Sequence, residues 1–341
     1  MSKKFTLALA LLLALTVLLA ACFAESASAE DPEVLTFFYT ADFDAISGWG
    51  PMVTPGGGEG SVTKGDNAAI VKAAEDGWGG VQSDVITLDL SQNPFLFVQI
   101  MENHDGFKWG AKFTPSDPLI EDHAWGFYLI PDNNFKWNSY AVVDLTERLG
   151  DYIDLYGETI EGVLWIYAAG GPDAEVEVTS VKIANTGNDP FFYTADFNAI
   201  SGWGPMVTPG GGEGSVTKGD NAAIVRAAED GWGGVQSDVI TLDLSQNPFL
   251  FVQIMENHDG FKWGAKFTPS DPLIEDHAWG FYLIPDNNLK WNLYAAVDLT
   301  ERLGDYIDLY GETIEGVLWV YAAGGPDAEV EVTSVKIANT K

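Results

Sequence analysis

The sequence predicts an all-β fold made of two tandem β-sandwich domains of the jelly-roll type. Three observations lead to this prediction. A segment of 150 residues occurs twice, short β-rich runs fill each copy, and almost no stretch has the spacing of an amphipathic helix. Strands without intervening helices cannot build βαβ units, so a sandwich is favoured.

The repeat sets the domain organisation. Residues 37–186 recur as residues 191–340 at an offset of 154, and a period of this length indicates a duplicated domain rather than a solenoid. Each copy has its own set of strands and is expected to fold alone. The expected segments are a signal peptide at 1–21, a tether at 22–36, repeat 1 at 37–186, a linker at 187–190 and repeat 2 at 191–341.

The two copies differ at six positions in 150. The differing pairs are Asp44/Asn198, Lys72/Arg226, Phe135/Leu289, Ser139/Leu293, Val142/Ala296 and Ile166/Val320.

Strand predictions for repeat 1 rest on β-branched and aromatic runs that Gly, Pro, Asn and Asp separate. The predicted strands cover residues 68–74, 85–90, 94–101, 108–113, 124–130, 139–145, 163–168 and 175–183. The only expected helical turn is at residues 146–150.

The N-terminus has the pattern of an export signal. Two lysines precede an uncharged run that ends in small residues, which is typical of a secretion signal and too short for a membrane span. Leu19-Ala20-Ala21-Cys22 resembles a bacterial lipobox, in which Cys22 would be acylated and become the new N-terminus. The competing site, Ala27-Ser28-Ala29, would release a soluble protein. We therefore expect a lipid-anchored protein outside the cell membrane, with secretion as the alternative.

The charge excludes one class of partner. Removal of residues 1–21 takes away two lysines and no acid, so the formal charge goes from −33 to −35. Such a field repels a polyanion such as nucleic acid, while cations and neutral ligands remain open. Cys22 is the only cysteine, so no disulfide supports the fold and each domain needs a sizeable core.

Several short sequence segments of repeat 1 resemble those of a known family. Trp78-Gly-Gly-Val-Gln-Ser, Ile86-Thr-Leu-Asp-Leu, Asn93-Pro-Phe-Leu-Phe-Val and Lys108-Trp-Gly-Ala-Lys, followed by the closing runs at 162–167 and 177–183, resemble the galactose-binding-like jelly roll of carbohydrate-binding modules. The resemblance lies in strand rhythm over most of each copy. It implies non-catalytic binding of a glycan, and no binding residue of the family matches position by position.

Tryptophan is the strongest local signal, with six in each copy. A flat indole can cover the C–H face of a sugar ring, but it also fills cores. Period-two alternation places Trp109 and Trp125 in the core, while Trp165 fits either face. Trp49 and Trp78 lie between glycines, where a ligand can approach closely.

Trp137 is a further candidate because Phe135 and Ser139, two residues to either side, both become leucine in repeat 2. In an extended segment these positions would form a variable surface around a fixed tryptophan.

A second candidate surface is the outer face of the middle strands. There Phe97, Gln99, Lys108, Lys112, Tyr128 and Tyr140 are expected to form a mixed aromatic and polar face. Such a face suits a glycan or a contact between domains. The candidate ligand-binding residues are Trp49, Trp78, Gln99, Tyr128 and Trp137 in repeat 1, and Trp203, Trp232, Gln253, Tyr282 and Trp291 in repeat 2.

Catalysis is not expected. His104 and His123 both adjoin carboxylates, but the strand at 108–113 separates them by roughly 20 Å, which is too far for one site. The acidic loops at Asp42, Asp44 and Asp76 suit either a structural calcium ion or a solvated turn. No other cofactor is expected.

The sequence therefore predicts two like modules that bind a polysaccharide at the cell surface. The alternative is a structural or adhesive protein that self-associates through its repeats, and a weaker one is an accessory subunit of a sugar transporter or a polysaccharide-degrading complex. Exposed tryptophans in a groove would favour binding, and a large apolar patch would favour self-association.

Overall fold

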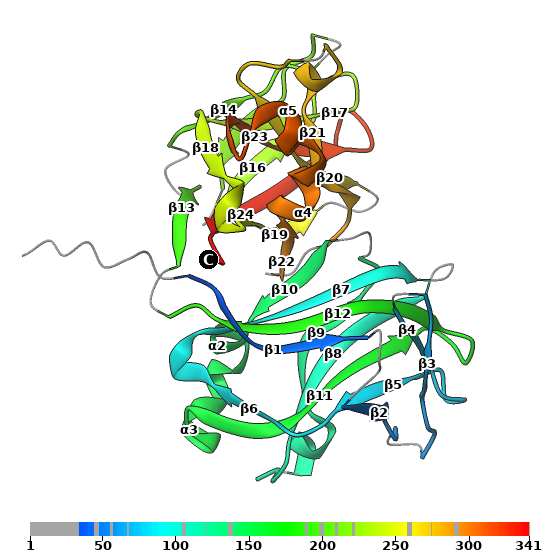
Figure 1. Cartoon of the computed structure of the whole chain (residues 1–341). Coiled ribbons are helices and arrows are strands. Elements are labelled where there is room, and N and C mark those ends of the chain that lie inside the picture. The colour runs from blue at the N-terminus through cyan, green and yellow to red at the C-terminus, as the bar shows by residue number, and fades with distance from the viewer. Residues whose placement is uncertain are drawn as a thin grey trace, which may run out of the picture. The chain divides into compact units, whose positions relative to one another are not determined.

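Strands dominate both repeats (Figure 1). Residues 34–341 form one compact unit, and no helix in the part of it described below is long and apolar enough to cross a membrane. The all-β class predicted from the sequence is confirmed. The computed structural model describes residues 34–43, 48–54, 57–66, 68–103, 107–119, 121–135, 139–187, 190–197, 201–208, 211–219, 222–257, 261–273, 275–289 and 293–340.

The elements of repeat 1 are β1 (Thr36–Asp42), β2 (Trp49–Pro51), β3 (Ser61–Lys64), β4 (Ala69–Lys72), β5 (Trp78–Ser83), β6 (Ile86–Asp89), η1 (Leu90–Gln92), β7 (Pro94–Asn103), β8 (Lys108–Pro115), η2 (Glu121–Trp125), β9 (Phe127–Asn133), β10 (Tyr140–Asp144), α2 (Leu145–Leu149), η3 (Gly150–Tyr152), α3 (Ile153–Tyr156), β11 (Thr159–Ala169) and β12 (Glu175–Asn185).

The elements of repeat 2 follow in the same order: β13 (Phe191–Asp196), β14 (Trp203–Pro205), β15 (Ser215–Lys218), β16 (Ala223–Arg226), β17 (Trp232–Ser237), β18 (Ile240–Asp243), η4 (Leu244–Gln246), β19 (Phe249–Asn257), β20 (Lys262–Pro269), η5 (Glu275–Trp279), β21 (Phe281–Asn287), β22 (Leu293–Asp298), α4 (Leu299–Leu303), η6 (Gly304–Tyr306), α5 (Ile307–Tyr310), β23 (Thr313–Ala323) and β24 (Glu329–Ala338).

Each repeat is a sandwich of two antiparallel layers. One layer, here called the platform sheet, has the strand order β2-β5-β11-β8-β9 in repeat 1 and β14-β17-β23-β20-β21 in repeat 2. In each platform sheet a further strand, β6 or β18, pairs with the long strand β11 or β23. The other layer belongs to a twelve-stranded sheet to which both repeats contribute, here called the shared sheet.

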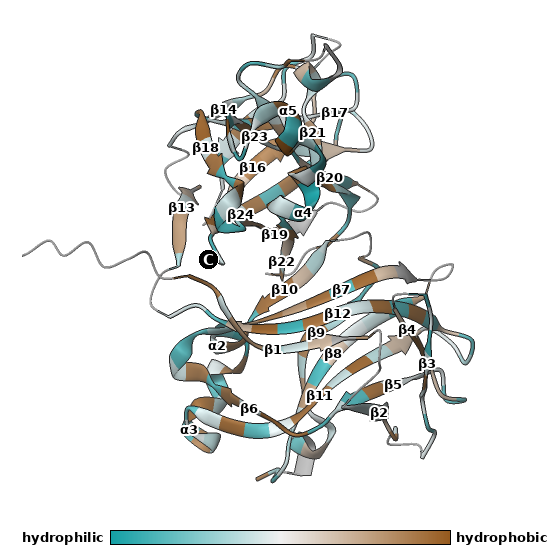
Figure 2. Cartoon of the chain, in the orientation of Figure 1, coloured by the Kyte–Doolittle hydropathy of each residue, from teal (hydrophilic) through white to brown (hydrophobic). Residues whose placement is uncertain are grey.

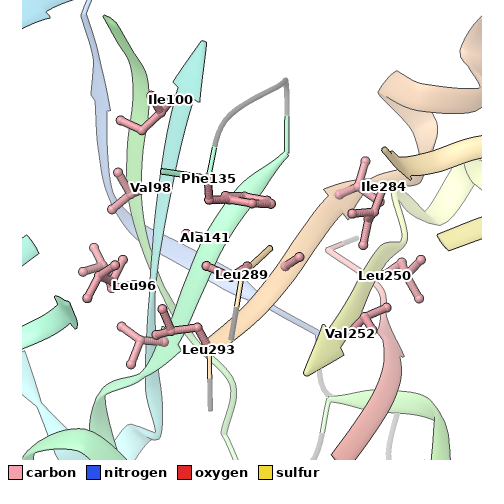
Figure 3. Close-up of a cluster of buried hydrophobic side chains, with 14 of the residues drawn as sticks. Leu96, Val98, Ile100, Phe135, Ala141, Leu250, Val252, Ile284, Leu289 and Leu293 are labelled. Carbon is pink, nitrogen blue, oxygen red and sulfur yellow. The ribbon is translucent and has the colours of Figure 1, made fainter. Parts of the chain in front are cut away.

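Side-chain alternation separates the core from the outer faces, and in Figure 2 strongly hydrophobic bands alternate with paler ones along β11. Along β7 of the shared sheet, Leu96, Val98 and Ile100 belong to the core (Figure 3). Facing them from β8 is Trp109, which is fully buried and donates its indole N–H to the carbonyl oxygen of Phe135 over 2.7 Å. The predicted core position of Trp109 is therefore confirmed.

Strand β5 was not among the predicted strands. Its residue Gly80 pairs with Tyr167 of β11, and a side chain there would collide with the backbone of Ile166 and Tyr167. Glycine is thus required by close strand packing at this position, which composition alone does not distinguish from a loop.

The predicted helical turn is present as α2. Its N-cap is Asp144, whose carboxylate accepts hydrogen bonds from the backbone N–H groups of Thr146 (2.9 Å) and Glu147 (3.0 Å). Burial raises the pKa of Asp144 above its ordinary value, although these two bonds oppose the shift.

Two predictions based on alternation are wrong. Trp125 lies in the short helix η2, before the strand, and its side chain is 44% exposed rather than in the core. Phe135 and Ser139 are both buried, so the substitutions at these positions vary the interior and not a surface around Trp137. Trp137 itself lies outside the described residues.

The two repeats meet through their edge strands in the shared sheet. β10 pairs with β22 in antiparallel register, with Ala141 opposite Ala295 and two flanking pairs, Tyr140 with Ala296 and Val142 with Tyr294. The backbone N–H of Leu35 also donates to the carbonyl oxygen of Asn339 over 2.9 Å. These contacts join the repeats by main-chain hydrogen bonds, so their cores are continuous.

An aromatic cluster covers the same junction on the outer face of the shared sheet. It contains Phe95, Phe97 and Tyr140 of repeat 1 and the corresponding Phe249, Phe251 and Tyr294 of repeat 2, flanked by Phe37 and Phe191. Its contacts are reciprocal: Phe37–Phe249 and Phe95–Phe191 are separated by 6.0 and 6.4 Å, and Tyr140–Phe249 and Phe95–Tyr294 by 6.0 Å each. The junction is therefore self-complementary, like the interface of a two-fold dimer.

Candidate ligand-binding face

The outer face of the platform sheet carries a row of polar and aromatic side chains across four strands. In repeat 1 the strand register places Gln82 of β5 beside Trp165 of β11, Trp165 beside Lys112 of β8, and Lys112 beside Tyr128 of β9. Each of the four strands contributes one residue to this row, and these side chains point away from the core because successive residues of a strand point to opposite faces. Together with Trp78, this row is here called the platform face.

Aromatic rings of the platform face differ in exposure. Tyr128 is 56% exposed and Trp78 is half-buried, whereas Trp165 is buried beneath them. Trp78 and Tyr128 each contact the ring of Tyr167, with centroids 6.0 and 6.5 Å away. The face thus offers two accessible rings on a fixed aromatic base.

Tyr167, the ring that both Trp78 and Tyr128 contact, is held in place by burial and by a hydrogen bond. It is 2% exposed, and its hydroxyl donates to a carboxylate oxygen of Asp132 over 2.8 Å. Burial, and then the negative charge of Asp132, raise the pKa of Tyr167 far above its ordinary value. The hydroxyl therefore stays protonated, and Asp132 remains tied to the rim of the platform face.

Lys112 occupies the centre of the platform face. Only 5% of its surface is exposed, and its ammonium nitrogen lies 4.4 Å from the ring centroid of Tyr128, 5.7 Å from Trp165 and 5.8 Å from Trp78. These are cation–π distances. Within the described part of the chain no carboxylate forms an ion pair with Lys112. Burial lowers the pKa of this lysine, because desolvation disfavours the charged form.

Repeat 2 reproduces the arrangement. Lys266 lies 4.4 Å from the ring of Tyr282, 5.6 Å from Trp319 and 5.8 Å from Trp232, and its pKa is lowered by burial in the same way. Tyr321 donates to Asp286 over 2.7 Å. The chain therefore carries two platform faces.

Several residues predicted for the site lie elsewhere. Trp49 and Trp203 are 8% exposed and pack in the core against Phe43 and Phe197, so their selection as ligand-binding residues is wrong. A tryptophan between glycines can plug the end of a sandwich as well as face solvent, and here it does the former.

The residues predicted to form the second candidate surface lie on two different sheets, so they do not form one face. Gln99 and Gln253 are buried on the shared sheet, where each side chain accepts a hydrogen bond from a threonine hydroxyl, Thr179 (2.8 Å) or Thr333 (2.9 Å). Phe97 and Tyr140 lie in the aromatic cluster, whereas Lys112 and Tyr128 lie on the platform face. Trp78, Tyr128, Trp232 and Tyr282 are the predicted residues that the structure brings onto the platform faces. Trp291, like Trp137, falls outside the described residues.

Lys112 was predicted on the second candidate surface but was not selected as a ligand-binding residue, and Trp165 and Tyr167 were not assigned to a site. The signal for the two aromatic residues was present in β11, where Leu164 and Ile166 alternate with Trp165 and Tyr167, so both faces of the strand are apolar. A strand with two apolar faces needs a cover on its outer side or a ligand there.

The structure describes one of the two histidines considered in repeat 1. His123 Nδ1 lies 2.8 Å from the hydroxyl of Tyr156, and the rings of Phe127 and Tyr152 enclose it at 4.8 and 5.2 Å. His104 lies outside the described residues, as does Asp44. Asp76 accepts a hydrogen bond from the hydroxyl of Thr54 over 2.6 Å, and the described ranges contain no group of three His, Cys, Asp or Glu side chains placed to hold a metal ion.

No family model matches the sequence, and no curated protein matches it either. Solved structures that align with the chain include the tandem CBM22-1–CBM22-2 domains of Xyn10C from Paenibacillus barcinonensis, at 13% identity and a TM-score of 0.25, over 92% of this chain and 100% of that one. A putative secreted protein from Parabacteroides distasonis aligns at 9% identity and a TM-score of 0.16, over 88% and 99%. The infectious bursal disease virus Gx strain structure aligns at 12% identity and a TM-score of 0.17, over 90% and 71%.

Proposed function

We propose that each platform face binds a polysaccharide without catalysis. The observation that carries this proposal is the pairing of accessible rings, Trp78 and Tyr128, with polar groups across one sheet face. Rings cover the C–H faces of sugars, and neighbouring amide, carboxylate and ammonium groups bind the hydroxyls. From β5 to β9 the face crosses three strand intervals, or roughly 14 Å, which suits an oligosaccharide segment better than a single sugar.

Self-association is the second candidate function, and the aromatic cluster is the observation that favours it. In this chain the apolar patch of each repeat is covered by the other repeat. The patch is therefore used within one molecule, which leaves the platform faces as the surfaces for an external partner.

The test of glycan binding is the pair of substitutions Trp78→Ala and Trp232→Ala in the full chain. We expect the double variant to lose roughly 5- to 150-fold in affinity for the polysaccharide that retains wild type, because a ring stacked on one aromatic side chain contributes about 1–3 kcal/mol per site. The measurement is a binding isotherm on a panel of insoluble polysaccharides. Thermal unfolding by circular dichroism verifies that the sandwich is intact.

The matched control replaces an exposed tryptophan that is not a member of the platform face. Trp125→Ala with Trp279→Ala removes indoles that are 44% and 46% exposed, and should leave binding unchanged. Retention of wild type on no member of the panel, or equal losses in both double variants, would reject the platform faces as glycan sites.

We also propose that the modules are displayed on the outer side of the cell membrane by a lipid on Cys22, which lies outside the described residues. Cys22→Ala should abolish incorporation of labelled palmitate and change the processing of the precursor. A wild-type protein free in the medium, with Glu30 as its N-terminal residue, would show instead that the signal is cleaved after Ala29.

A further inference from the structure

The platform face contains two polar groups that lack acceptors. The ammonium group of Lys112 has aromatic neighbours and no ion pair, and the indole N–H of Trp165 is buried without a hydrogen-bond partner among the described residues. Both groups are donors, and the register places them side by side on adjacent strands. Trp319 and Lys266 repeat the pattern in the second platform face.

An unpaired buried cation is costly. Taking an ammonium group out of water is compensated only in part by cation–π contacts, which contribute on the order of 0.5–2 kcal/mol. A buried hydrogen-bond donor that has no acceptor costs the folded protein a further penalty of about 1–3 kcal/mol. An apolar side chain of the same length would avoid both costs, so the charge of Lys112 is best explained by a partner that arrives with the ligand.

We propose that the ligand of the platform face carries a carboxylate, which makes it an acidic polysaccharide built from uronic acid units. This inference rests on the glycan-binding function proposed above. The carboxylate accepts from the ammonium group of Lys112, while the sugar ring lies against Tyr128 or Trp78. A charge-assisted hydrogen bond of this kind is roughly twice as strong as a neutral one.

The net charge of the chain sets how salt acts on this binding. At −33, the protein repels an acidic polymer at long range, and this repulsion is screened over about 8 Å at physiological ionic strength. The contact at Lys112 is short and mostly buried, so salt weakens it much less. Binding should therefore hold or strengthen when salt rises from low to physiological concentration, whereas binding to an exposed basic patch would weaken.

The experiment compares polygalacturonate, alginate and hyaluronate with their carboxyl-reduced neutral forms, using the full chain. Wild type should bind at least one acid form tenfold or more tightly than its neutral form. Lys112→Met with Lys266→Met should remove that preference while it leaves the weaker binding to the neutral form in place. Methionine keeps the length of the side chain and suits the aromatic surroundings, so the fold should persist.

Lys108→Met with Lys262→Met is the matched control. These lysines lie on the same strands and the same faces, but they are exposed, so the control removes the same charge and should keep the preference for the acid form. Equal binding of acid and neutral forms by wild type, or equal losses in the two double variants, would overturn the inference.

The outcomes also separate this inference from the proposed function. Loss of binding in Trp78→Ala with Trp232→Ala, together with no preference for acid forms in wild type, would keep the glycan site and reject the carboxylate. Failure of wild type to bind any acid or neutral polymer, including the wider panel described above, would reject the glycan site itself.

Discussion

The first repeat expressed alone, as residues 34–187, should form a dimer. Without repeat 2, its strand β10 has a free edge and the aromatic cluster loses half of its members. Because the contacts between the repeats are reciprocal, a second copy of repeat 1 can take the place of repeat 2 with the same geometry. Analytical ultracentrifugation at micromolar concentration should show twice the mass of the repeat.

Phe97→Asp in the isolated repeat should shift this equilibrium to monomer. Phe97 is fully buried and lies 5.9 Å from Phe251 across the junction, so a charge there opposes association strongly. Phe38→Asp is the control, because Phe38 is 44% exposed and outside the cluster. A wild-type repeat that is monomeric, with the thermal stability of the full chain, would contradict this prediction and show that the repeats are independent.

The second large effect concerns the presence of two platform faces. Disabling one of them with Trp78→Ala and Tyr128→Ala should weaken retention on an insoluble polysaccharide by about 10²-fold or more. The reason is that, when one of two linked sites releases the polymer, the other site still holds it and the first can bind again. The isotherm should be compared with binding to a short soluble oligosaccharide. On that ligand the remaining site should keep its affinity, and only the number of sites should halve.

The corresponding pair Trp232→Ala and Tyr282→Ala tests the other repeat. The two platform faces are built from residues of the same types at corresponding positions, so both one-site variants should fall to the same affinity. A loss of only twofold in each, as expected from counting sites, would show that the two faces do not engage the same polymer together.

Much of the fold followed from local patterns in the sequence. Runs such as the one that forms β7 alternate between two environments, and their length and turn signals separate them from helices. Four strands of repeat 1 were not predicted: β1, β2, β3 and β5. The last three are short or rich in glycine, and their pairing partners keep them extended, so only long-range contacts reveal them. The first, β1, is a seven-residue run rich in aromatic and threonine residues that the prediction missed.

The platform face was less predictable for a related reason. Alternation places Lys112 and Tyr128 on outer faces, and it does the same for Phe97 and Gln99, but it does not say to which sheet a strand belongs. The sheet assignment separates these residues into one face that is open and one that the other repeat covers. The spacing of residues within one strand carries no information on that difference, because the difference arises from strand order.

The junction also changes which edges of the sheet are open to other chains. An uncovered strand edge pairs readily with foreign strands and can start aggregation, and β10 and β22 cover each other's edge. The strands at the two ends of the main strand path, β3 and β15, are four residues long, and each ends in a lysine. Two longer strands, β1 and β13, pair with β12 and β24 off this path, and each ends in an aspartate. Short, charged edges resist pairing, so the sheet ends at β3 and β15 are poor templates for fibre growth.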